Sequence, residues 1–224
     1  MRKDGIVAMI PVKGDSERVP KKNIRPFADT TLIELKIKQT KESGAFDEIV
    51  VSSEDGKILE LASKMGVSIH ERDPKYSTSD VPMSDVYSYL AESVQWSDIA
   101  WVNVTNPLIG EDAYQEAVKQ YRSMPSEKDS LISVCELKEY VFHNEKPVNF
   151  EPYPWPRSQD LKGLAIPTFA ISILKTTDLI ERGTLIGENP FFFFMDPLDS
   201  TDIDYMHDFW LCELIYQKRK SGEL

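Results

Sequence analysis

The sequence of 224 residues has only two cysteines, Cys135 and Cys212, and no apolar run long enough to cross a membrane. A membrane-spanning helix needs about 20 apolar residues, and the apolar stretch near the N-terminus is too short and too soon followed by polar residues for a signal peptide. Two cysteines without metal-ligand spacing argue against a disulfide framework and a cysteine metal centre. We therefore expect two buried reduced thiols in a cytoplasmic protein without a membrane partner.

Positive charge is also scarce, because 26 Lys and Arg face 37 Asp and Glu, which gives a formal net charge of −11 at pH 7. This balance argues against a nucleic-acid partner, since surfaces that bind nucleic acids neutralise phosphates over a broad basic face. Five of the 26 basic residues nevertheless lie between positions 13 and 25, a segment that we call the basic loop. An anionic ligand would have to be met locally, by this loop.

Short apolar runs alternate with helical patterns along most of the chain. The runs predict strands at 6–11, 48–53, 67–71, 98–104, 130–137, 164–174 and 190–195. Continuous apolar runs are typical of strands covered on both faces, and we interpret the four phenylalanines of the last run as such a buried strand. Thr30 or Thr31 is expected to cap a first helix that stops at Gly44. Further helices are expected at 54–66, 83–94, 111–124, 177–182 and from about 205.

This alternation predicts an α/β fold with three layers and a mostly parallel sheet. We expect a single domain over residues 1–224 with an inserted arm or small lobe around 138–165, where prolines and aromatic residues are frequent. The arm could serve in dimerisation or as a cover for the site. Ligands of such sheets bind beyond the carboxyl ends of the strands, and the basic loop directly follows the first strand.

The basic loop lies within "IPVKGDSERVPKKN", residues 10–23. A triphosphate needs close backbone approach, which Gly14 permits, and cationic side chains such as Lys13 and Lys22. The stretch is neither a Walker A loop nor a dinucleotide-binding fingerprint. Taken alone, it could equally be a solvated surface loop.

The stretch "TDIDYMHD" (201–208) offers a possible metal site. On an extended segment Asp202 and Asp204 point to the same face while Ile203 points into the core. Paired carboxylates suit Mg²⁺, which completes its coordination with water and substrate phosphates. The alternative is a solvated strand end or a helix N-terminus with favourable acids, and Asp208 is assigned to the first turn of the last helix.

Five stretches jointly resemble the acylneuraminate cytidylyltransferase family, whose members make CMP-sialic acid and related CMP-activated acids. Residues 10–23 are similar to the family pattern I-P-A-R-G-G-S-K-G-I-P-x-K-N without a change in length. The other similar stretches are 46–67, 71–80, "RSQDL" (157–161) and "DIDYMHDFWLCE" (202–213). The resemblance thus extends from about residue 6 to 214.

The resemblance implies a Rossmann-like three-layer sandwich of the nucleotide-diphospho-sugar transferase type, and a homodimer whose arm crosses to the partner. It further implies a Mg²⁺-dependent nucleotidyltransferase that transfers CMP from CTP to the hydroxyl of a nonulosonic or sialic-acid-like acid, or a related small anion, and releases pyrophosphate. The residues that it implies are Lys13, Lys22, Asp202 and Asp204 for catalysis, the two aspartates as metal ligands, Lys13, Gly14, Lys22, Asn23, Arg72 and Ser84 for the nucleotide, and Asn103, Arg157, Gln159 and Thr168 for the acceptor.

Departures from the family pattern cluster on the acceptor side. "NVTNPLI" (103–109) stands where the family has Q-P-T-S-P-L-R, and "PTFAISI" (167–173) where it has E-N-G-A-I-Y-I. Asn103 thus replaces a glutamine, Ile109 an arginine and Phe169 a glycine, which predicts an acceptor other than ordinary sialic acid. Three alternatives stay open: a nucleotide-binding homologue that no longer catalyses, a nucleotidyltransferase that uses another base or a non-sugar acceptor, and an unrelated α/β protein.

Overall fold

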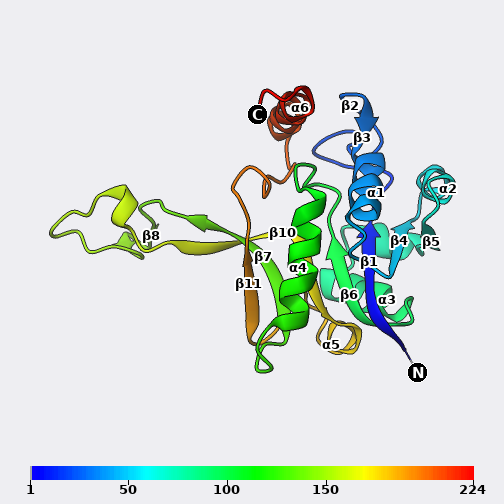
Figure 1. Ribbon diagram of the computed structural model, residues 1–224, viewed down its shortest axis with the longest axis horizontal. Coiled ribbons are helices and arrows are strands. Elements are labelled where there is room, and N and C mark those ends of the chain that lie inside the picture. Colours follow the sequence, from blue (N-terminus) through cyan, green and yellow to red (C-terminus); the bar gives the residue numbers. More distant parts are fainter. Residues whose placement is uncertain (1) are drawn as a thin grey trace.

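The computed structural model describes residues 2–224, which form a three-layer α/β sandwich with one projecting arm (Figure 1). Seven strands make the central sheet in the order β11-β7-β10-β6-β1-β4-β5. Their bounds are Lys3–Pro11 (β1), Glu48–Ser53 (β4), Ser68–Glu71 (β5), Trp96–Val102 (β6), Ser130–Leu137 (β7), Leu164–Lys175 (β10) and Pro190–Phe194 (β11). Two small hairpins pair β2 (Pro26–Phe27) with β3 (Thr30–Thr31) and β8 (Phe142–His143) with β9 (Lys146–Pro147).

Six α-helices are found among the described residues, close to the positions expected from the sequence. They are α1 (Leu32–Ser43), α2 (Gly56–Lys64), α3 (Met83–Glu92), α4 (Glu111–Ser123), α5 (Thr176–Arg182) and α6 (Met206–Ser221). The capping prediction is confirmed for α1: Thr31 Oγ1 accepts from the Glu34 N–H at 3.3 Å, and Gly44 closes the helix at φ +59°. Glycine suits that closure because it adopts a left-handed conformation without steric cost.

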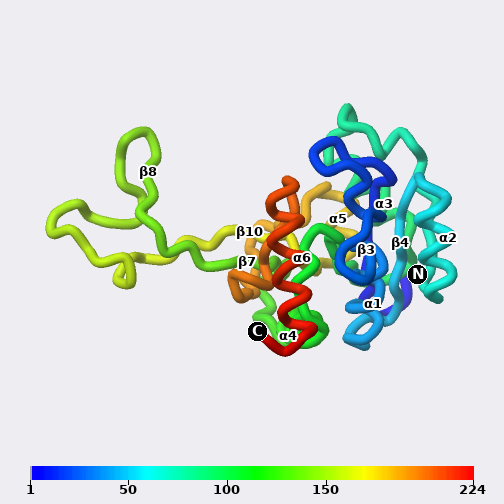
Figure 2. The backbone as a smooth tube through the Cα atoms, turned by 90° about the horizontal axis from the view of Figure 1, so that it is seen from above, coloured from blue at the N-terminus to red at the C-terminus, as the bar shows by residue number. Residues whose placement is uncertain are grey.

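The strand β1 is covered on both faces, as its continuous apolar run predicts. Ile6, Ala8 and Ile10 belong to one buried cluster, whereas Val7 and Met9 belong to another. Helices α1, α2, α4 and α6 contribute to the first cluster, and α3 and α5 to the second. Figure 2 shows α1 and α4 on one side of the sheet and α3 and α5 on the other.

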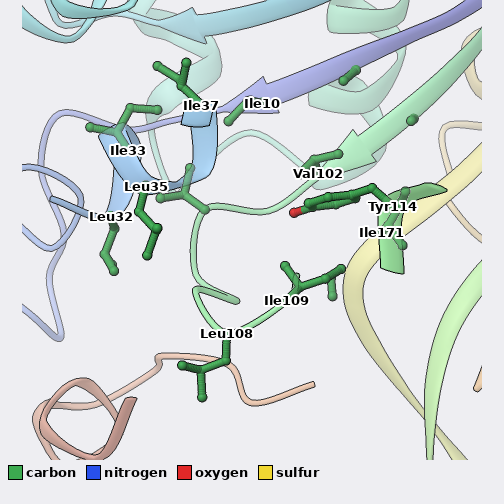
Figure 3. Packing of buried hydrophobic residues seen from close by; sticks show 14 of the residues in the cluster. Ile10, Leu32, Ile33, Leu35, Ile37, Val102, Leu108, Ile109, Tyr114 and Ile171 are labelled. Atoms are coloured by element: carbon green, nitrogen blue, oxygen red, sulfur yellow. The ribbon is translucent and has the colours of Figure 1, made fainter. Parts of the chain in front are cut away.

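The larger cluster joins helix α1 to the central strands below the carboxyl edge of the sheet. Figure 3 shows Tyr114 of α4 beside Val102 of β6 and Ile171 of β10. Ile109 is fully buried in the same cluster. Ile109, which stands where the family pattern has arginine, therefore belongs to the core of this chain.

The prediction of a mostly parallel sheet is confirmed, with β10 as the exception. Strand β1 runs parallel to β4 and β6, β4 parallel to β5, and β7 parallel to β11. Strand β10 runs antiparallel to both of its neighbours, β6 and β7. The strand that leads back from the arm is thus the one that runs opposite to its neighbours in the sheet.

Two expectations about burial are corrected. Strand β11 is not buried on both faces, because it forms the edge of the sheet, where Phe192 and Phe194 are 43% and 59% exposed. Cys212 is buried, and burial raises its pKa to about 12, but Cys135 is only half-buried. Both thiols are free.

The arm comprises residues 138–163, between β7 and β10, and extends away from the sandwich (Figures 1 and 2). Its base is a continuation of the sheet, since Leu137 of β7 pairs with Leu164 of β10. Beyond the base it contains only the β8–β9 hairpin and a single 3-10 turn, Ser158–Asp160. No helix in residues 2–224 combines the length and apolar character that crossing a membrane would require.

Candidate active site

A cleft of about 490 Å³ opens where β1 and β6 end, at the carboxyl edge of the sheet. Its walls are the basic loop after β1, the polar segment 77–79 and the turn after β6. The lining residues are Pro11, Lys13, Asp15, Ser16, Glu17, Arg18, Lys22, Asn23, Ser77, Thr78, Ser79, Asn103, Val104 and Thr105. Ligands of doubly wound sheets bind at this edge, which makes the cleft the candidate site.

The basic loop is anchored by its apolar and small residues. Val19 is fully buried, and the Lys22 N–H donates to the Val19 carbonyl oxygen at 3.0 Å. A β-carbon on Gly14 would stand 2.7 Å from Cβ of Asp55, the N-cap of α2. The Gly14 N–H itself donates to the Glu54 carboxylate at 2.8 Å. Close packing on the start of α2 therefore requires the glycine, in addition to any approach of a phosphate.

Lys22 and Asn23 are buried at the base of the cleft. The Lys22 ammonium donates to the carbonyl oxygen of Ile203 at 2.6 Å. Burial lowers the pKa of Lys22, whereas the charges of Asp202 and Asp204 raise it. Asn23 donates from Nδ2 to the Lys13 carbonyl at 2.8 Å. Its buried Oδ1 has no hydrogen-bond partner within residues 2–224.

The two aspartates lie on the extended segment between β11 and α6, as the sequence predicts. Ile203 between them is fully buried, and its N–H donates to the Thr105 carbonyl at 2.9 Å. Asp202 retains exposure to solvent but is partly desolvated, which raises its pKa, while a hydrogen bond with Thr105 acts in the opposite direction. Asp208 accepts from the N–H groups of Asp204 and Tyr205 at the start of α6.

A divalent cation is compatible with this pair but would not be held by the protein alone. No cluster of three or more His, Cys, Asp or Glu side chains suited to a metal occurs in residues 2–224. Mg²⁺ commonly takes one or two carboxylates and completes its shell with water and substrate phosphates. Desolvation is the main cause of the raised pKa of Asp202 and the charge of Asp204 adds to it, so a cation beside the two carboxylates would favour their charged forms.

Of the residues that the resemblance implies for the nucleotide, Arg72 and Ser84 lie outside the lining of the cleft, as does Gly14. The Arg72 guanidinium is 3% exposed and donates to the carbonyl oxygens of Val12 and Ser52, where it ties the ends of β1 and β4 together. Ser84 lies in the first turn of α3, and the closest atoms to a β-carbon on Gly183 would be those of Ser84. A nucleotide contact by either residue stays a prediction.

The residues implied for the acceptor are not brought together in one chain. Asn103 lines the cleft, and its Oδ1 accepts from Trp101 Nε1 at 3.0 Å. Thr168 is buried and donates to the Ser133 hydroxyl at 2.8 Å, away from the lining. Arg157 and Gln159 are exposed on the arm, where Arg157 pairs with Asp160 at 2.6 Å. Their acceptor roles also stay predictions.

Three further residues of the site escaped the sequence-based assignment. Arg18 and Thr105 line the cleft and contact Asp204 and Asp202 respectively. Glu54 bridges two walls, because it accepts from the Gly14 N–H and, at 2.7 Å, from the Ser77 hydroxyl. Arg18 was visible as one of five clustered basic residues, but nothing in the sequence distinguished it from the other four.

A sequence model of the family described as cytidylyltransferase matches residues 7–175, which includes the basic loop, the cleft and most of the sheet. This chain belongs to the cytidylyltransferase family. Its members are nucleotidyltransferases, and the resemblance to acylneuraminate cytidylyltransferases is confirmed by individual relatives. The chain is 26% identical to the pseudaminic acid cytidylyltransferase of Campylobacter jejuni, in an alignment that covers 94% of this chain and 96% of the relative.

It is also 27% identical to N-acylneuraminate cytidylyltransferase A of Danio rerio, in an alignment that covers 93% of this chain and 50% of the relative. The chain thus spans half the length of the vertebrate cytidylyltransferase but nearly all of the bacterial one.

Solved structures confirm the fold of the nucleotide-diphospho-sugar transferase type. A CMP:2-keto-3-deoxy-manno-octonic acid synthetase in complex with CTP superposes with a TM-score of 0.68 at 12% identity, over 96% of this chain and 99% of that chain. A cytidylyltransferase from Leptospira borgpetersenii serovar Hardjo-bovis superposes with a TM-score of 0.61 at 20% identity, over 100% and 96% of the two chains.

Proposed function

We propose that this cytidylyltransferase transfers CMP from CTP to a hydroxyl group of a nonulosonic acid and releases pyrophosphate. The observation that supports the proposal is a basic loop that lines the cleft, with the carboxylate pair 202/204 behind that lining on a segment that Lys22 ties to the loop. Membership of the family supports the use of CTP. A cytoplasmic location stays a prediction from the sequence.

The proposed reaction transfers the CMP group directly from CTP to the acceptor, without a covalent enzyme intermediate. The acceptor oxygen forms a bond to the α-phosphorus, the bond from that phosphorus to the bridging oxygen breaks, and the pyrophosphate carries away the electron pair. The hydroxyl proton passes to solvent or to a nearby carboxylate. In such a reaction the protein contributes position and charge, which we assign to Lys13, Lys22 and Asn23 on the phosphate side.

The carboxylate pair fits a magnesium ion, and we propose Asp202 and Asp204 as its ligands. Bound there, Mg²⁺ would neutralise charge that develops on the phosphates. Lys22 holds the segment between the two ligands through the Ile203 carbonyl, and Thr105 holds it from the opposite wall through the Ile203 N–H. These two contacts keep the carboxylates beside the cleft before any ligand enters.

For the acceptor we propose a nonulosonic acid, and pseudaminic acid is the first candidate. The Campylobacter jejuni relative, which matches over nearly its whole length, is named for pseudaminic acid. On the acceptor side the Asn103 amide presents its two N–H donors and one remaining acceptor position, because its oxygen already accepts from Trp101 Nε1. A site with few polar partners disfavours an acceptor with many unpaired hydroxyl groups, and deoxy acids have fewer of them.

We also propose that the chain works as a homodimer, as a single catalytic domain whose arm provides the contact. The arm exposes Phe142, Val148, Tyr153 and Trp155, each at least 50% exposed. The edge strand β11 adds exposed phenylalanines near the base of the arm. Apolar surface of this extent on a small arm favours association with another protein surface. Dimerisation would also explain how Arg157 and Gln159 reach an acceptor, since they lie outside their own cleft.

A pyrophosphate-release assay tests the reaction and the acceptor together. Purified protein is incubated with Mg²⁺ and CTP, and with UTP in parallel, against pseudaminic acid, N-acetylneuraminic acid and 2-keto-3-deoxy-manno-octonic acid. We expect release with CTP and a nonulosonic acid, and none with UTP. If none of the acceptors leads to pyrophosphate release, although CTP stabilises the protein against heat, catalysis is contradicted and a nucleotide-binding homologue is favoured. Sedimentation at micromolar concentration tests the dimer, which a monomeric boundary would contradict.

A further inference from the structure

An ion pair between Arg18 and Asp204 joins two segments that are far apart in the sequence. Arg18 Nη2 lies 2.7 Å from Asp204 Oδ1. The guanidinium carbon also lies 5.4 Å from the centre of the Tyr205 ring, which offers its face to the cation. Arg18 itself lines the cleft together with Lys13 and Lys22. A cationic side chain of the basic loop is therefore paired with one of the two proposed metal ligands.

This pair is easily broken. The side chains of Arg18 and Asp204 are 52% and 45% exposed, and pairs of such exposure contribute little to stability because water and salt screen them. Lys22 differs in this respect, because it is buried and hydrogen-bonded to a backbone carbonyl. Of the two cations beside the carboxylates, Lys22 is held in place and Arg18 is free to leave.

The loop around Arg18 allows such a movement. Residues 12–18 form neither helix nor strand, whereas the next residue, Val19, is fully buried and fixes the backbone beyond it. A released guanidinium would remain over the cleft, since its own Cα does not have to move. Its planar fork of N–H donors matches phosphate oxygens, which a lysine can contact only as a point charge.

We propose that Arg18 and a divalent cation exchange places on Asp204, so that arrival of the metal releases Arg18 to bind the phosphates of the nucleotide. Arg18 thus has two roles: it neutralises Asp204 while the site is empty, and it binds the substrate once the metal has arrived. The exchange keeps the charge around the carboxylates balanced in both states. It gives a reason for a cation to stand beside a metal ligand. The inference rests on the proposed function for its nucleotide half, but not for its metal half.

The test measures metal and nucleotide separately in wild-type protein and in Arg18→Gln. Binding of Mn²⁺ alone, a spectroscopic substitute for Mg²⁺ that also prefers oxygen ligands, is followed by electron paramagnetic resonance. Binding of CTP is followed by calorimetry at saturating Mg²⁺. The matched control is Arg25→Gln, which removes the same charge from the same loop, but from a side chain that stacks on Phe209 and does not line the cleft.

The exchange predicts effects of opposite sign. Arg18→Gln binds Mn²⁺ more tightly, by up to about fivefold for a pair of this exposure, and binds CTP more weakly. Arg25→Gln changes the affinities for Mn²⁺ and for CTP less than Arg18→Gln does. In an Asp204→Asn background the Arg18 substitution no longer changes Mn²⁺ binding, because the competition has been removed.

Weaker Mn²⁺ binding by Arg18→Gln, or unchanged Mn²⁺ binding, would overturn the exchange. So would an equal gain in Arg25→Gln, which would reduce the effect to net charge. If wild-type protein binds no CTP, the proposed function fails and the nucleotide half of the inference falls with it. The Mn²⁺ comparison would then still decide whether Arg18 competes for Asp204.

Discussion

The ammonium of Lys22 donates to the carbonyl oxygen of Ile203, 181 positions further along the chain, at 2.6 Å. This contact joins the basic loop to the segment of Asp202 and Asp204 behind the lining of the cleft. A residue that is buried and hydrogen-bonded in this way cannot be moved by salt or solvent as an exposed cation can. The cleft therefore has one fixed cation beside its carboxylates before any ligand binds.

Replacing Lys22 by methionine is expected to lower turnover at least about 100-fold, as loss of one preorganised electrostatic group typically does. The segment 202–204 would lose its anchor, and the phosphates would lose a fixed positive charge. Steady-state kinetics with CTP measure the effect. The control is Lys21→Gln, which removes the same charge from an exposed neighbour. Equal losses in the two variants would show that only the net charge of the loop matters.

Replacing Asp202 by asparagine is expected to nearly abolish turnover without lowering the melting temperature at pH 7. Partial desolvation raises the pKa of Asp202, so the folded protein disfavours its charged form. The wild-type protein therefore loses stability as the pH rises through that raised pKa, and the variant does not. Calorimetry and kinetics measure the two effects. The control is Asp4→Asn, on an exposed residue at the opposite end of β1. Full activity of the Asp202 variant would exclude the aspartate from the site.

Lys36 provides a pH-dependent test of the core below the site. It is fully buried on α1 and donates to the Asn106 carbonyl and the Tyr114 hydroxyl, at 2.7 and 2.8 Å. Burial holds its pKa well below the ordinary 10.5. The unfolded chain thus binds more protons below pH 10.5, and the free energy of unfolding rises with pH in that window.

Urea denaturation at several pH values between 7 and 10 measures this dependence. In Lys36→Met the increase with pH is expected to be smaller than in the wild-type protein. Lys38→Met, on the exposed face of the same helix, should keep the wild-type increase. If Lys36→Met keeps it as well, Lys36 carries its proton in the folded protein at neutral pH as readily as in water.

Phe169 tests the backbone of β10, where the family pattern has glycine. It adopts φ +53°, and the pairing of β10 with β7 shifts between Pro167 and Ser172. A left-handed conformation costs a residue with a β-carbon about 1 kcal/mol or more. Phe169→Gly is therefore expected to be more stable than Phe169→Ala by about 1 kcal/mol, the reverse of the order in an ordinary strand. Urea denaturation of the two variants decides the sign.

Local signals predicted the elements of the fold well. The cap at Thr31, the stop at Gly44 and the alternation of strands and helices are properties of neighbouring residues, and the structure contains all of them. The edge position of β11 was not predictable in this way, because it depends on the order of strands in the sheet. For the same reason the phenylalanines of β11 read as a buried strand, although two of them face solvent.

Motifs indicated candidate site residues one by one, whereas contacts between distant segments left no signal in the sequence. The motif resemblance indicated Lys22, Asn23 and both aspartates. Lys22 and Asn23 line the cleft, and Lys22 ties the segment of the aspartates to it. The pairing of Arg18 with Asp204 has no sequence signal, because the two residues meet only through the fold. The arm residues Arg157 and Gln159 carry a motif but lie away from their own cleft, and only an assembly of chains could change that.

The measurement that tests the central claim most directly is ³¹P nuclear magnetic resonance of the protein with CTP, Mg²⁺ and pseudaminic acid. The account predicts that the three CTP signals decline together, while a phosphodiester signal grows and a pyrophosphate signal, which comes from two phosphorus atoms, grows to twice its intensity. Asp204→Asn should leave CTP intact under the same conditions. Transfer of CMP in this cleft would be contradicted if CTP persists with correctly folded protein and each nonulosonic acid tried. Conversion of CTP to CDP and phosphate would contradict it as well.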